Sequence, residues 1–376
     1  MRTKGILITV FFLLAISLPL LLQCIGVEPK RSDAENRKLE PKPSFTFENT
    51  ALANGVANKA QALYLDYKQY KEKYDRYYQD NFVLKEQLFD LYNHMQLNIF
   101  SKSPIPKKVV LGTSDWLFIG DGYSSVILES KAVINFTDAE LQAIRRNLLK
   151  RNNWLQERGI AYYIAIAPEK HTLLGQYLPI RQGDRPTKRA QFKALMTGSG
   201  IEIADLTEPL LPYGHAKLYH KTDSHWNDLG AFLACQALLS RINQKYSHVP
   251  ALNLADFKAC HELKYDGDLA RMLNLAIAED QMLLQNTAPV ARLTASSIPD
   301  YQNATETRFK GHANKLKVLV FRDSFCSAMM NFLKESFGET VFIWSYEFDK
   351  ELIEREKPDI VIQEVVEREL DQLLIK

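Results

Sequence analysis

The chain has 376 residues, of which 46% are hydrophobic, so it can bury one sizeable core with an accessory part beside it. Its formal net charge is only +2, with lysine and arginine scattered along the sequence, which argues against nucleic-acid binding. The four cysteines match no zinc-site spacing, and one of them lies in the apolar N-terminal run, so at most one disulfide is expected among the other three.

The N-terminus predicts a membrane anchor. Arg2 and Lys4 precede an almost uninterrupted apolar run over residues 6–25, and about twenty such residues can span a bilayer. No clear Ala-x-Ala cleavage site follows, so residues 1–26 are predicted to be an uncleaved signal anchor. The positive charges before the run favour an N-terminus inside the cell and an exported body. The expected location is therefore the periplasmic or extracellular face of the cytoplasmic membrane.

Residues 27–104 are predicted to form a polar tether followed by a helical region. Within residues 57–100, tyrosines recur mostly at three- and four-residue spacing, namely Tyr64, Tyr67, Tyr70, Tyr74, Tyr77 and Tyr78. Asp80-Asn81 is expected to interrupt the helix. An exposed aromatic row would suit sugar rings, but packing against the main domain is the favoured interpretation, since amphipathic helices usually bury their apolar stripe.

From residue 105 onward, strands and helices alternate, which predicts an α/β sheet flanked by helices. Strands are expected near residues 160–167, 201–203, 317–321, 341–344 and 360–362, and helices after the capping box at Thr137 and over 188–198, 228–244 and 364–374. Residues 252–299 show no clear pattern. A Walker loop and a dinucleotide fingerprint are both missing from the sequence, and no cofactor is predicted.

Ser324 is the candidate nucleophile. It follows the apolar run 317–321 and precedes apolar residues at helical spacing, so it is expected where a buried strand turns into a helix. Such a turn lifts a hydroxyl out of the sheet, and the free N–H groups of the helix N-terminus would hold an oxyanion. Asp323 and Ser324 are also ordinary N-cap residues, so the short motif taken alone favours capping.

The stretch YHKTDSHWNDLG, residues 219–230, offers the other two groups that a nucleophilic serine needs. Asp223 and His225 are separated by one residue and would supply an orienting acid and a base from one turn. In the alternative interpretation, Asp223 or Asn227 caps a helix that begins near Asp228, and His225 is simply exposed.

Five further residues in three places are additional candidates. Lys170 and His171 follow the predicted strand 160–167, at the edge where open α/β sheets place ligand-binding residues, although a solvated loop would explain them too. Gly267-Asp268 would supply a backbone N–H near the site, or form a simple turn. Asp323 is an alternative orienting acid, but its position next to the nucleophile is expected to point it elsewhere.

The order of the Asp-x-His-Trp-Asn and strand–Asp-Ser-Phe–helix motifs resembles the AlgJ/AlgX-type O-acetyltransferases of exopolysaccharide modification. Other stretches that look like blocks of this family are 35–37, 112–118, 166–170, 267–269, 357–361 and 364–368. The resemblance implies an SGNH-hydrolase-like parallel sheet over residues 105–376, with Ser324, His225 and Asp223 as the catalytic triad. Arg322 stands where SGNH motifs often carry glycine, which puts a glycine-based oxyanion donor in doubt.

The same resemblance implies an activity and its partners. The chain is expected to move acetyl groups onto hydroxyls of an exported polysaccharide such as alginate through an acetyl-serine, with no metal and no cofactor. A membrane-bound O-acyltransferase would supply the acetyl groups. Two alternatives remain open at this point: a carbohydrate esterase or deacetylase that uses the same triad with water, and a non-catalytic glycan-binding scaffold of an exopolysaccharide assembly.

Overall fold

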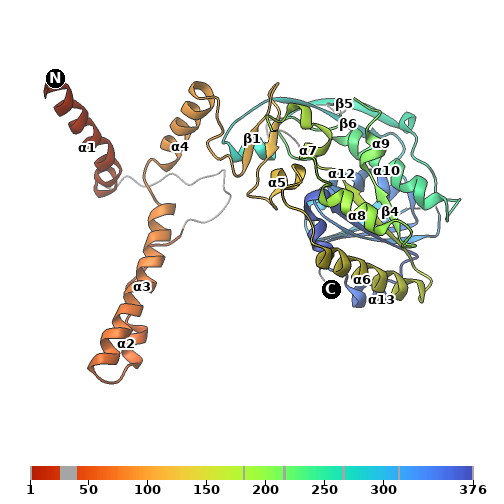
Figure 1. Ribbon diagram of the computed structural model, residues 1–376, viewed down its shortest axis with the longest axis horizontal. Helices are drawn as coiled ribbons and strands as arrows, with labels where there is room; N and C mark the ends of the chain where they lie inside the picture. Colours follow the sequence, from red (N-terminus) through yellow and green to blue (C-terminus); the bar gives the residue numbers. More distant parts are fainter. Residues whose placement is uncertain are drawn as a thin grey trace. The chain divides into compact units, whose positions relative to one another are not determined.

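The computed structural model describes residues 2–25, 40–180, 183–214, 217–264, 267–311 and 314–374 (Figure 1). The chain forms two compact units, Met1–Pro104 and Ile105–Lys376. Most of the tether predicted to follow the N-terminal run, including the block 35–37, lies outside the described residues.

The first unit is helical. Its helices are α1 (Arg2–Cys24), α2 (Glu48–Leu52), α3 (Val56–Asp80) and α4 (Lys85–His94), followed by a π-helical turn (Met95–Ile99). The helix predicted from the tyrosine spacing ends at Asp80, where the sequence indicated a break. The buried carboxylate of Asp66 accepts hydrogen bonds from the backbone N–H groups and side chains of Asn49 and Thr50, which ties α2 to α3.

Within the described part of the chain, none of the helices has the length and apolar character that crossing a membrane requires. The anchor over residues 1–26 therefore stays a prediction. So does the burial of the tyrosine row against the main domain, and Tyr64 and Tyr67 are exposed.

The second unit is built on a seven-stranded sheet with the order β4-β3-β11-β9-β10-β8-β7. The strands β4, β3, β11, β9 and β10 are parallel, as predicted. However, β8 runs antiparallel to β10, and β7 antiparallel to β8, so the sheet is mixed rather than wholly parallel. The bounds are β3 (Ala161–Ala167), β4 (Glu202–Asp205), β7 (Arg292–Ser296), β8 (Glu306–Lys310), β9 (Lys317–Arg322), β10 (Glu339–Trp344) and β11 (Ile360–Val366). An antiparallel edge tolerates one solvated face, and β7 is largely exposed, which explains why its sequence lacks a clear apolar run.

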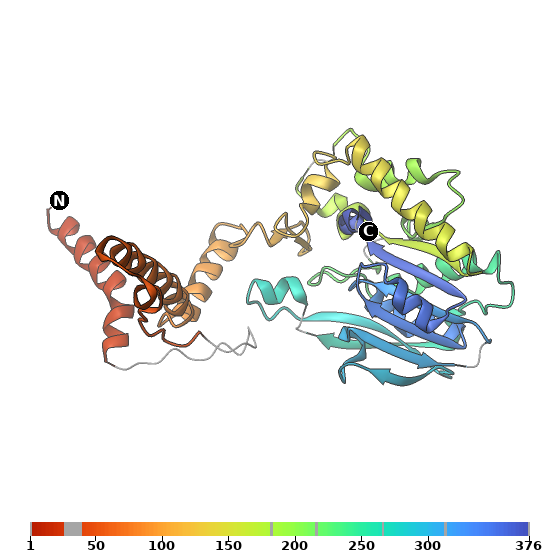
Figure 2. The ribbon, with the colours of Figure 1, turned by 90° about the horizontal axis from the view of Figure 1, so that it is seen from below.

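Helices cover both faces of this sheet (Figure 2). One face packs against α6 (Asp138–Gln156), α8 (Lys188–Met196) and α13 (Lys350–Glu356), and the other against α10 (Asp228–Asn243) and α12 (Cys326–Leu333). In β9, Val318 and Val320 enter one core while Leu319 and Phe321 enter the other. A parallel strand buried on both faces needs such an apolar run, and this is why β9 was recognisable in the sequence.

Smaller elements complete the unit. They are the hairpin of β1 (Val109–Leu111) and β2 (Leu117–Ile119), the ribbon of β5 (Phe257–Lys264) and β6 (Glu279–Asn286), and the short helices α5 (Val126–Ser130), α7 (Lys170–Leu173), α9 (Thr207–Leu210) and α11 (Asp268–Met272). The capping box at Thr137 forms as predicted. The prediction that a helix begins at Glu364 was wrong. Strand β11 continues to Val366, paired with β3, and a 3₁₀ helix follows over Glu367–Leu374.

Candidate active site

Ser324 lies in the turn between β9 and α12, at the carboxyl end of a central strand. The next residue, Phe325, is fully buried and packs edge-on against Trp226, with ring centroids 5.3 Å apart. The indole Nε1–H of Trp226 donates to the Phe325 carbonyl at 2.9 Å. These contacts join the Ser324 turn to the segment that carries Asp223 and His225.

The structure brings the three predicted residues into one hydrogen-bond chain. Ser324 Oγ lies 2.9 Å from His225 Nε2, and His225 Nδ1 lies 2.7 Å from Asp223 Oδ1. The same Asp223 oxygen accepts the backbone N–H of His225 at 2.9 Å, so the one-residue spacing closes a tight turn that aims the carboxylate at the ring. Asn227, rather than Asp223, caps α10 by accepting the Gly230 N–H. The cap is thus confirmed for Asn227, while the roles of Asp223 and His225 as orienting acid and base stay a prediction.

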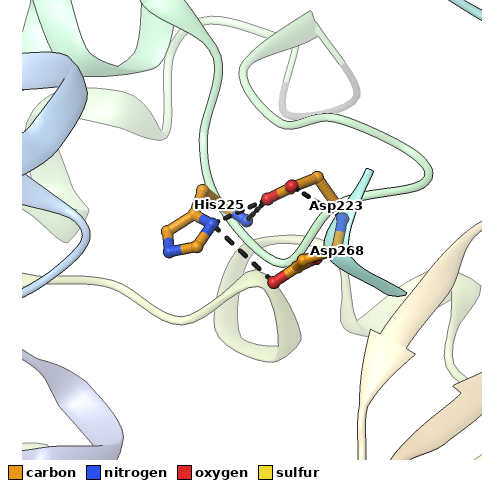
Figure 3. Close-up of side chains that lie close together, drawn as sticks. All are labelled: Asp223, His225 and Asp268. Atoms are coloured by element: carbon orange, nitrogen blue, oxygen red, sulfur yellow. Dashed lines mark hydrogen bonds and ion pairs between the residues drawn. The ribbon is translucent and has the colours of Figure 1, made fainter. Parts of the chain in front are cut away.

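A second carboxylate faces the imidazole (Figure 3). Asp268 Oδ2 lies 3.9 Å from His225 Nδ1, and the two Asp268 oxygens accept from the N–H and the hydroxyl of Ser224 at 2.7 and 2.6 Å. The backbone N–H of Asp268 donates to Asp223 Oδ2 at 2.9 Å. Thus both oxygens of Asp223 are held, one by the histidine and one by the start of α11.

These charges set the protonation behaviour of the chain. Burial by itself would lower the pKa of His225, but its hydrogen bond to Asp223 and the charges of Asp223 and Asp268 raise that pKa above its ordinary value. Burial opposes ionisation of Asp223, yet the hydrogen bond and charge of His225 hold the Asp223 pKa below its usual range. The pKa of Asp268 is raised by burial and by the neighbouring charge of Asp223. Asp223 therefore stays ionised beside the ring.

Asp223, His225 and Asp268 also offer three ligand atoms within 4.8 Å of one another, which is close enough to hold a metal ion. Their hydrogen bonds fit a different use. All four carboxylate oxygens accept hydrogen bonds from protein groups, and a cation on His225 Nδ1 would replace the proton that Asp223 accepts. The donor set therefore suits an orienting acid–base pair better than a metal centre.

Lys170 and His171 are neither in the cleft nor on a solvated loop. The Lys170 ammonium is 1% exposed and donates to the carbonyls of Leu117, Lys221 and Asp223, at 2.7, 3.1 and 2.9 Å. Burial lowers its pKa to about 7. The ring of His171 is also buried and pairs its Nε2 with the Ile119 carbonyl. Lys170 thus ties the backbone of the Asp223 turn to β2.

Asp323 points away from the imidazole, as expected. Its carboxylate accepts the N–H groups of Phe325 and Val366, at 2.8 and 2.7 Å, and its own N–H donates to Glu364. Burial raises the pKa of Asp323, and burial together with Asp323 raises the pKa of Glu364 well above its ordinary value. This buried acidic pair fixes the turn from beneath.

The contacts of the Arg322 side chain give a reason why arginine, rather than glycine, stands before Asp323. The side chain is fully buried, donates to the carbonyls of Gln302 and Ala304 and to the Ser327 hydroxyl, and lies over the Trp344 ring. A glycine at 322 would leave these carbonyls without this donor. Arg322 therefore fastens the Ser324 turn to the 3₁₀ segment that precedes β8.

The chain of Ser324, His225 and Asp223 opens into a cleft of about 740 Å³. Its walls come from α11, from β6 and from α12 and the segment before β8. The side chain of His225 is 28% exposed to this cleft. A small acyl group and part of a larger acceptor therefore have room beside the hydroxyl.

Asp268 is the site residue whose carboxylate the sequence analysis missed, since Gly267-Asp268 was considered only for a backbone N–H. The one feature of the sequence that could have indicated this role is the glycine before it. A Cβ at Gly267 would lie 2.4 Å from Thr222 Oγ1, so only glycine lets α11 approach the Asp223 turn this closely. Lys170 was noticed, but nothing in the sequence shows that it binds backbone carbonyls.

A mixed α/β sheet with this serine turn at its carboxyl edge defines an SGNH hydrolase-like protein. The chain matches the family described as SGNH hydrolase-like domain, acetyltransferase AlgX, over residues 109–347, and it belongs to that family.

Two curated relatives are similar over most of the chain. A probable alginate O-acetylase AlgJ of Pseudomonas syringae pv. tomato is 24% identical over 317 residues, which is 79% of this chain and 77% of the relative. Its counterpart from Pseudomonas putida is 23% identical and covers 79% and 78%. Among solved structures, Bacillus cereus PatB1 with a sulfonyl adduct superposes with a TM-score of 0.57 at 18% identity, over 71% of this chain and 98% of PatB1. This likeness supports the fold.

Proposed function

We propose that this chain is an O-acetyltransferase that moves acetyl groups onto hydroxyls of an exported polysaccharide through an acetyl-Ser324 intermediate. One observation carries the proposal: the hydrogen-bond chain from Ser324 through His225 to Asp223 ends in a cleft large enough for an acceptor. The curated relatives are named as alginate O-acetylases, which makes alginate the first acceptor to try.

In the first half-reaction, Ser324 Oγ attacks the carbonyl carbon of an acetyl donor while His225 Nε2 takes the hydroxyl proton. Asp223 accepts the Nδ1–H and stabilises the imidazolium that forms. The bond between the carbonyl carbon and the donor oxygen then breaks, and His225 returns the proton to the leaving alcohol. Acetyl-Ser324 and a neutral imidazole remain.

In the second half-reaction, a polysaccharide hydroxyl enters the cleft and gives its proton to His225 Nε2. Its oxygen attacks the acetyl carbon, the bond to Ser324 Oγ breaks, and the serine takes the proton back. Water in place of the sugar hydroxyl would give hydrolysis through the same steps. The outcome depends on which acceptor occupies the cleft.

The oxyanion of each tetrahedral intermediate needs donors near Ser324. The N–H of Phe325 already donates to Asp323, which removes one of the helix N-terminal groups that the sequence suggested. The N–H of Ser324 itself has no acceptor among the described residues, and we assign it as one oxyanion donor.

The test is intact-mass spectrometry of the purified chain with p-nitrophenyl acetate as donor, beside Ser324→Ala. We expect a transient gain of one acetyl mass in the wild type that alginate oligomers discharge faster than water does, and no adduct in the variant. Equal adducts in both proteins would contradict the proposal. Ser296→Ala, which removes a hydroxyl on the edge strand β7 that donates to the Ile298 carbonyl, is a matched control.

A carbohydrate esterase is the second candidate, because the partly exposed His225 is open to water. Discharge of the acetyl-serine only to water would favour it. Failure of every donor to acylate Ser324 would instead favour a non-catalytic glycan-binding scaffold.

The cellular setting belongs to the same proposal. An anchor over residues 1–26 would hold residues 105–376 at the outer face of the cytoplasmic membrane, within reach of a membrane-bound O-acyltransferase that supplies acetyl groups. The almost uninterrupted apolar run over residues 6–25, preceded by Arg2 and Lys4, supports this placement. Fractionation of cells that express the full chain, with a protease added from outside, would test it.

A further inference from the structure

Beside the catalytic cleft lies a second cavity of about 630 Å³, and the two share His220 and Gln281 as lining residues. We infer that this second cavity binds a sugar unit of the acceptor chain at a distance from the unit being acetylated. The inference rests on the proposed function and names the part of the molecule that would recognise a polymer rather than a single sugar.

Gln281 is the residue that points to a ligand. Its side chain is 8% exposed, lines both cavities and has no hydrogen-bond partner among the described residues. Its amide opens onto the two cavities without being engaged by a protein group, so a ligand can reach it without displacing a protein contact. A ligand hydroxyl, which both donates and accepts, would satisfy this amide.

The strand that carries Gln281 is fastened on both sides of it. Glu279 accepts the backbone N–H groups of Lys221 and Thr222, at 2.6 and 2.9 Å, and the Thr222 hydroxyl at 2.6 Å. Further along β6, the Leu284 N–H donates to Asp228 at 2.8 Å. Gln281 is therefore held in fixed register with the turn that carries His225, as a recognition residue for the same acceptor must be.

The other walls of the second cavity suit a sugar ring. Leu229, Ile277 and Met282 supply apolar surface for the C–H faces of a pyranose, and Lys217 and Lys221 supply donors at the edge. The two carboxylates of β6 have partners within the protein, since Glu279 accepts three hydrogen bonds and Asp280 pairs with His261. Lys221 already donates to the Ser114 carbonyl at 3.0 Å but keeps further N–H groups, so the two ammonium groups favour a hydroxyl-rich ring, with or without a carboxylate.

His220 forms the other shared wall. Its Nδ1 lies 3.9 Å from Glu279, and burial lowers its pKa despite the charges of Asp223 and Glu279. A neutral imidazole at this position both donates and accepts hydrogen bonds, like the amide of Gln281. A chain that crosses from one cavity to the other would pass between two such groups.

The experiment compares acceptors of increasing length with the purified full chain. Acetyl transfer from p-nitrophenyl acetate is measured with alginate dimers, tetramers and hexamers, and with cello-oligomers of the same lengths as neutral probes. We expect KM to fall with length in the wild type. Gln281→Leu, which keeps the side-chain volume but loses the amide, should raise KM for the longer acceptors about tenfold and leave little advantage over the dimer.

Two further variants keep the result interpretable. Glu262→Gln changes the exposed cross-strand partner of Gln281 and should retain the length advantage. Lys217→Ala changes an exposed residue that lines the second cavity, so it should leave the core intact. It should raise KM for the longer acceptors and not for the dimer. If the Lys217 ammonium binds a carboxylate of the acceptor, KM should rise more for alginate oligomers than for cello-oligomers.

Equal KM values for short and long acceptors in the wild type would overturn the inference, as would unchanged length dependence in both Gln281→Leu and Lys217→Ala. Slower acetylation of Ser324 in Gln281→Leu would also overturn it, because the cavity would then serve the donor. The acetyl-serine adduct, compared between wild type and Ser324→Ala, reports separately whether the proposed function itself fails.

Discussion

The turn that carries Ser324 and the turn that carries Asp223 and His225 meet in one hydrogen-bond chain, but they are held in place differently. Ser324 follows β9, whose side chains are buried on both faces of the sheet. The Asp223 turn lies outside the sheet and is held by polar groups, chiefly Lys170, Glu279 and Asp268. The strand that leads to Ser324 is positioned by packing, with Arg322 and Asp323 fixing the turn beyond it, whereas the turn of Asp223 and His225 depends chiefly on polar groups. Changes in charge should therefore act on the second turn, and changes in volume on the first.

Asp223→Asn should give the largest loss of activity, because Asp223 is the charged acceptor of the His225 Nδ1–H. Loss of the charged acceptor at His225 Nδ1 leaves the ring free to take the wrong tautomer, and kcat for acetyl transfer should fall about 10⁴-fold. Steady-state kinetics with a chromogenic acetyl ester measure this. Asp228→Asn, which alters a carboxylate that accepts from Leu284, is the control. A fall of less than tenfold in Asp223→Asn would mean that Asp268 orients the ring instead.

Lys170→Met should come next. The carbonyls of Leu117, Lys221 and Asp223 lose the ammonium as a donor, which should lower the free energy of unfolding by about 3 kcal/mol. Displacement of the Asp223 turn should lower kcat about 10- to 100-fold. Denaturant unfolding and kinetics on the same samples measure both effects. The exposed Lys245→Met is a control that should change neither. A stable variant with normal kcat would show that packing alone holds the Asp223 turn.

Asp268→Asn tests the charge on the base turn through pH. The protonated imidazole cannot accept the Ser324 proton, so activity should be lost as the pH falls through the raised pKa of His225. Removing a negative charge 3.9 Å away should lower that pKa, so the acid limb of kcat/KM should move to lower pH by about half to one unit. An acid limb that stays in place would mean that Asp268 carries no charge in this pH range.

Val320→Ala should have the smallest effect on the chemistry, since it tests the packed turn. Its side chain is fully buried in β9, and truncation should lower the free energy of unfolding by about 2 kcal/mol. The acid limb should not move. Thermal unfolding and a pH–rate profile measure the two quantities. A shifted acid limb would show that packing beneath Ser324 also sets the charge environment of His225.

The features that could be predicted from the sequence are local ones. The apolar run before Ser324 and the helical spacing after it define the strand–turn–helix, and a one-residue spacing is enough to set Asp223 against His225. The same holds for β3 and β9, which are buried on both faces and therefore need a largely apolar sequence. The catalytic roles of the three residues stay a prediction until acylation is measured.

The features that could not be predicted depend on contacts between distant segments. Asp268 reaches His225 only because Gly267 lets α11 approach Thr222, and a sequence does not show which backbone a glycine will approach. Glu364 was predicted to begin a helix because a charged residue is not expected inside a fully buried strand. It lies in β11, where its carboxylate accepts the Asp323 N–H. The antiparallel β7 and β8 lack the apolar runs that mark central strands.

The place of β11 in the sheet has a consequence for the order of assembly. It follows the other strands along the chain, yet it pairs with β3 on one side and β9 on the other. The Val366 N–H at its end also donates to Asp323, next to the nucleophile. During synthesis, β3 and β9, which flank β11 in the sheet, are made before β11 itself. The contact between Val366 and Asp323 can therefore form only after β11 has been synthesised, so we expect the Ser324 turn to be completed late in folding.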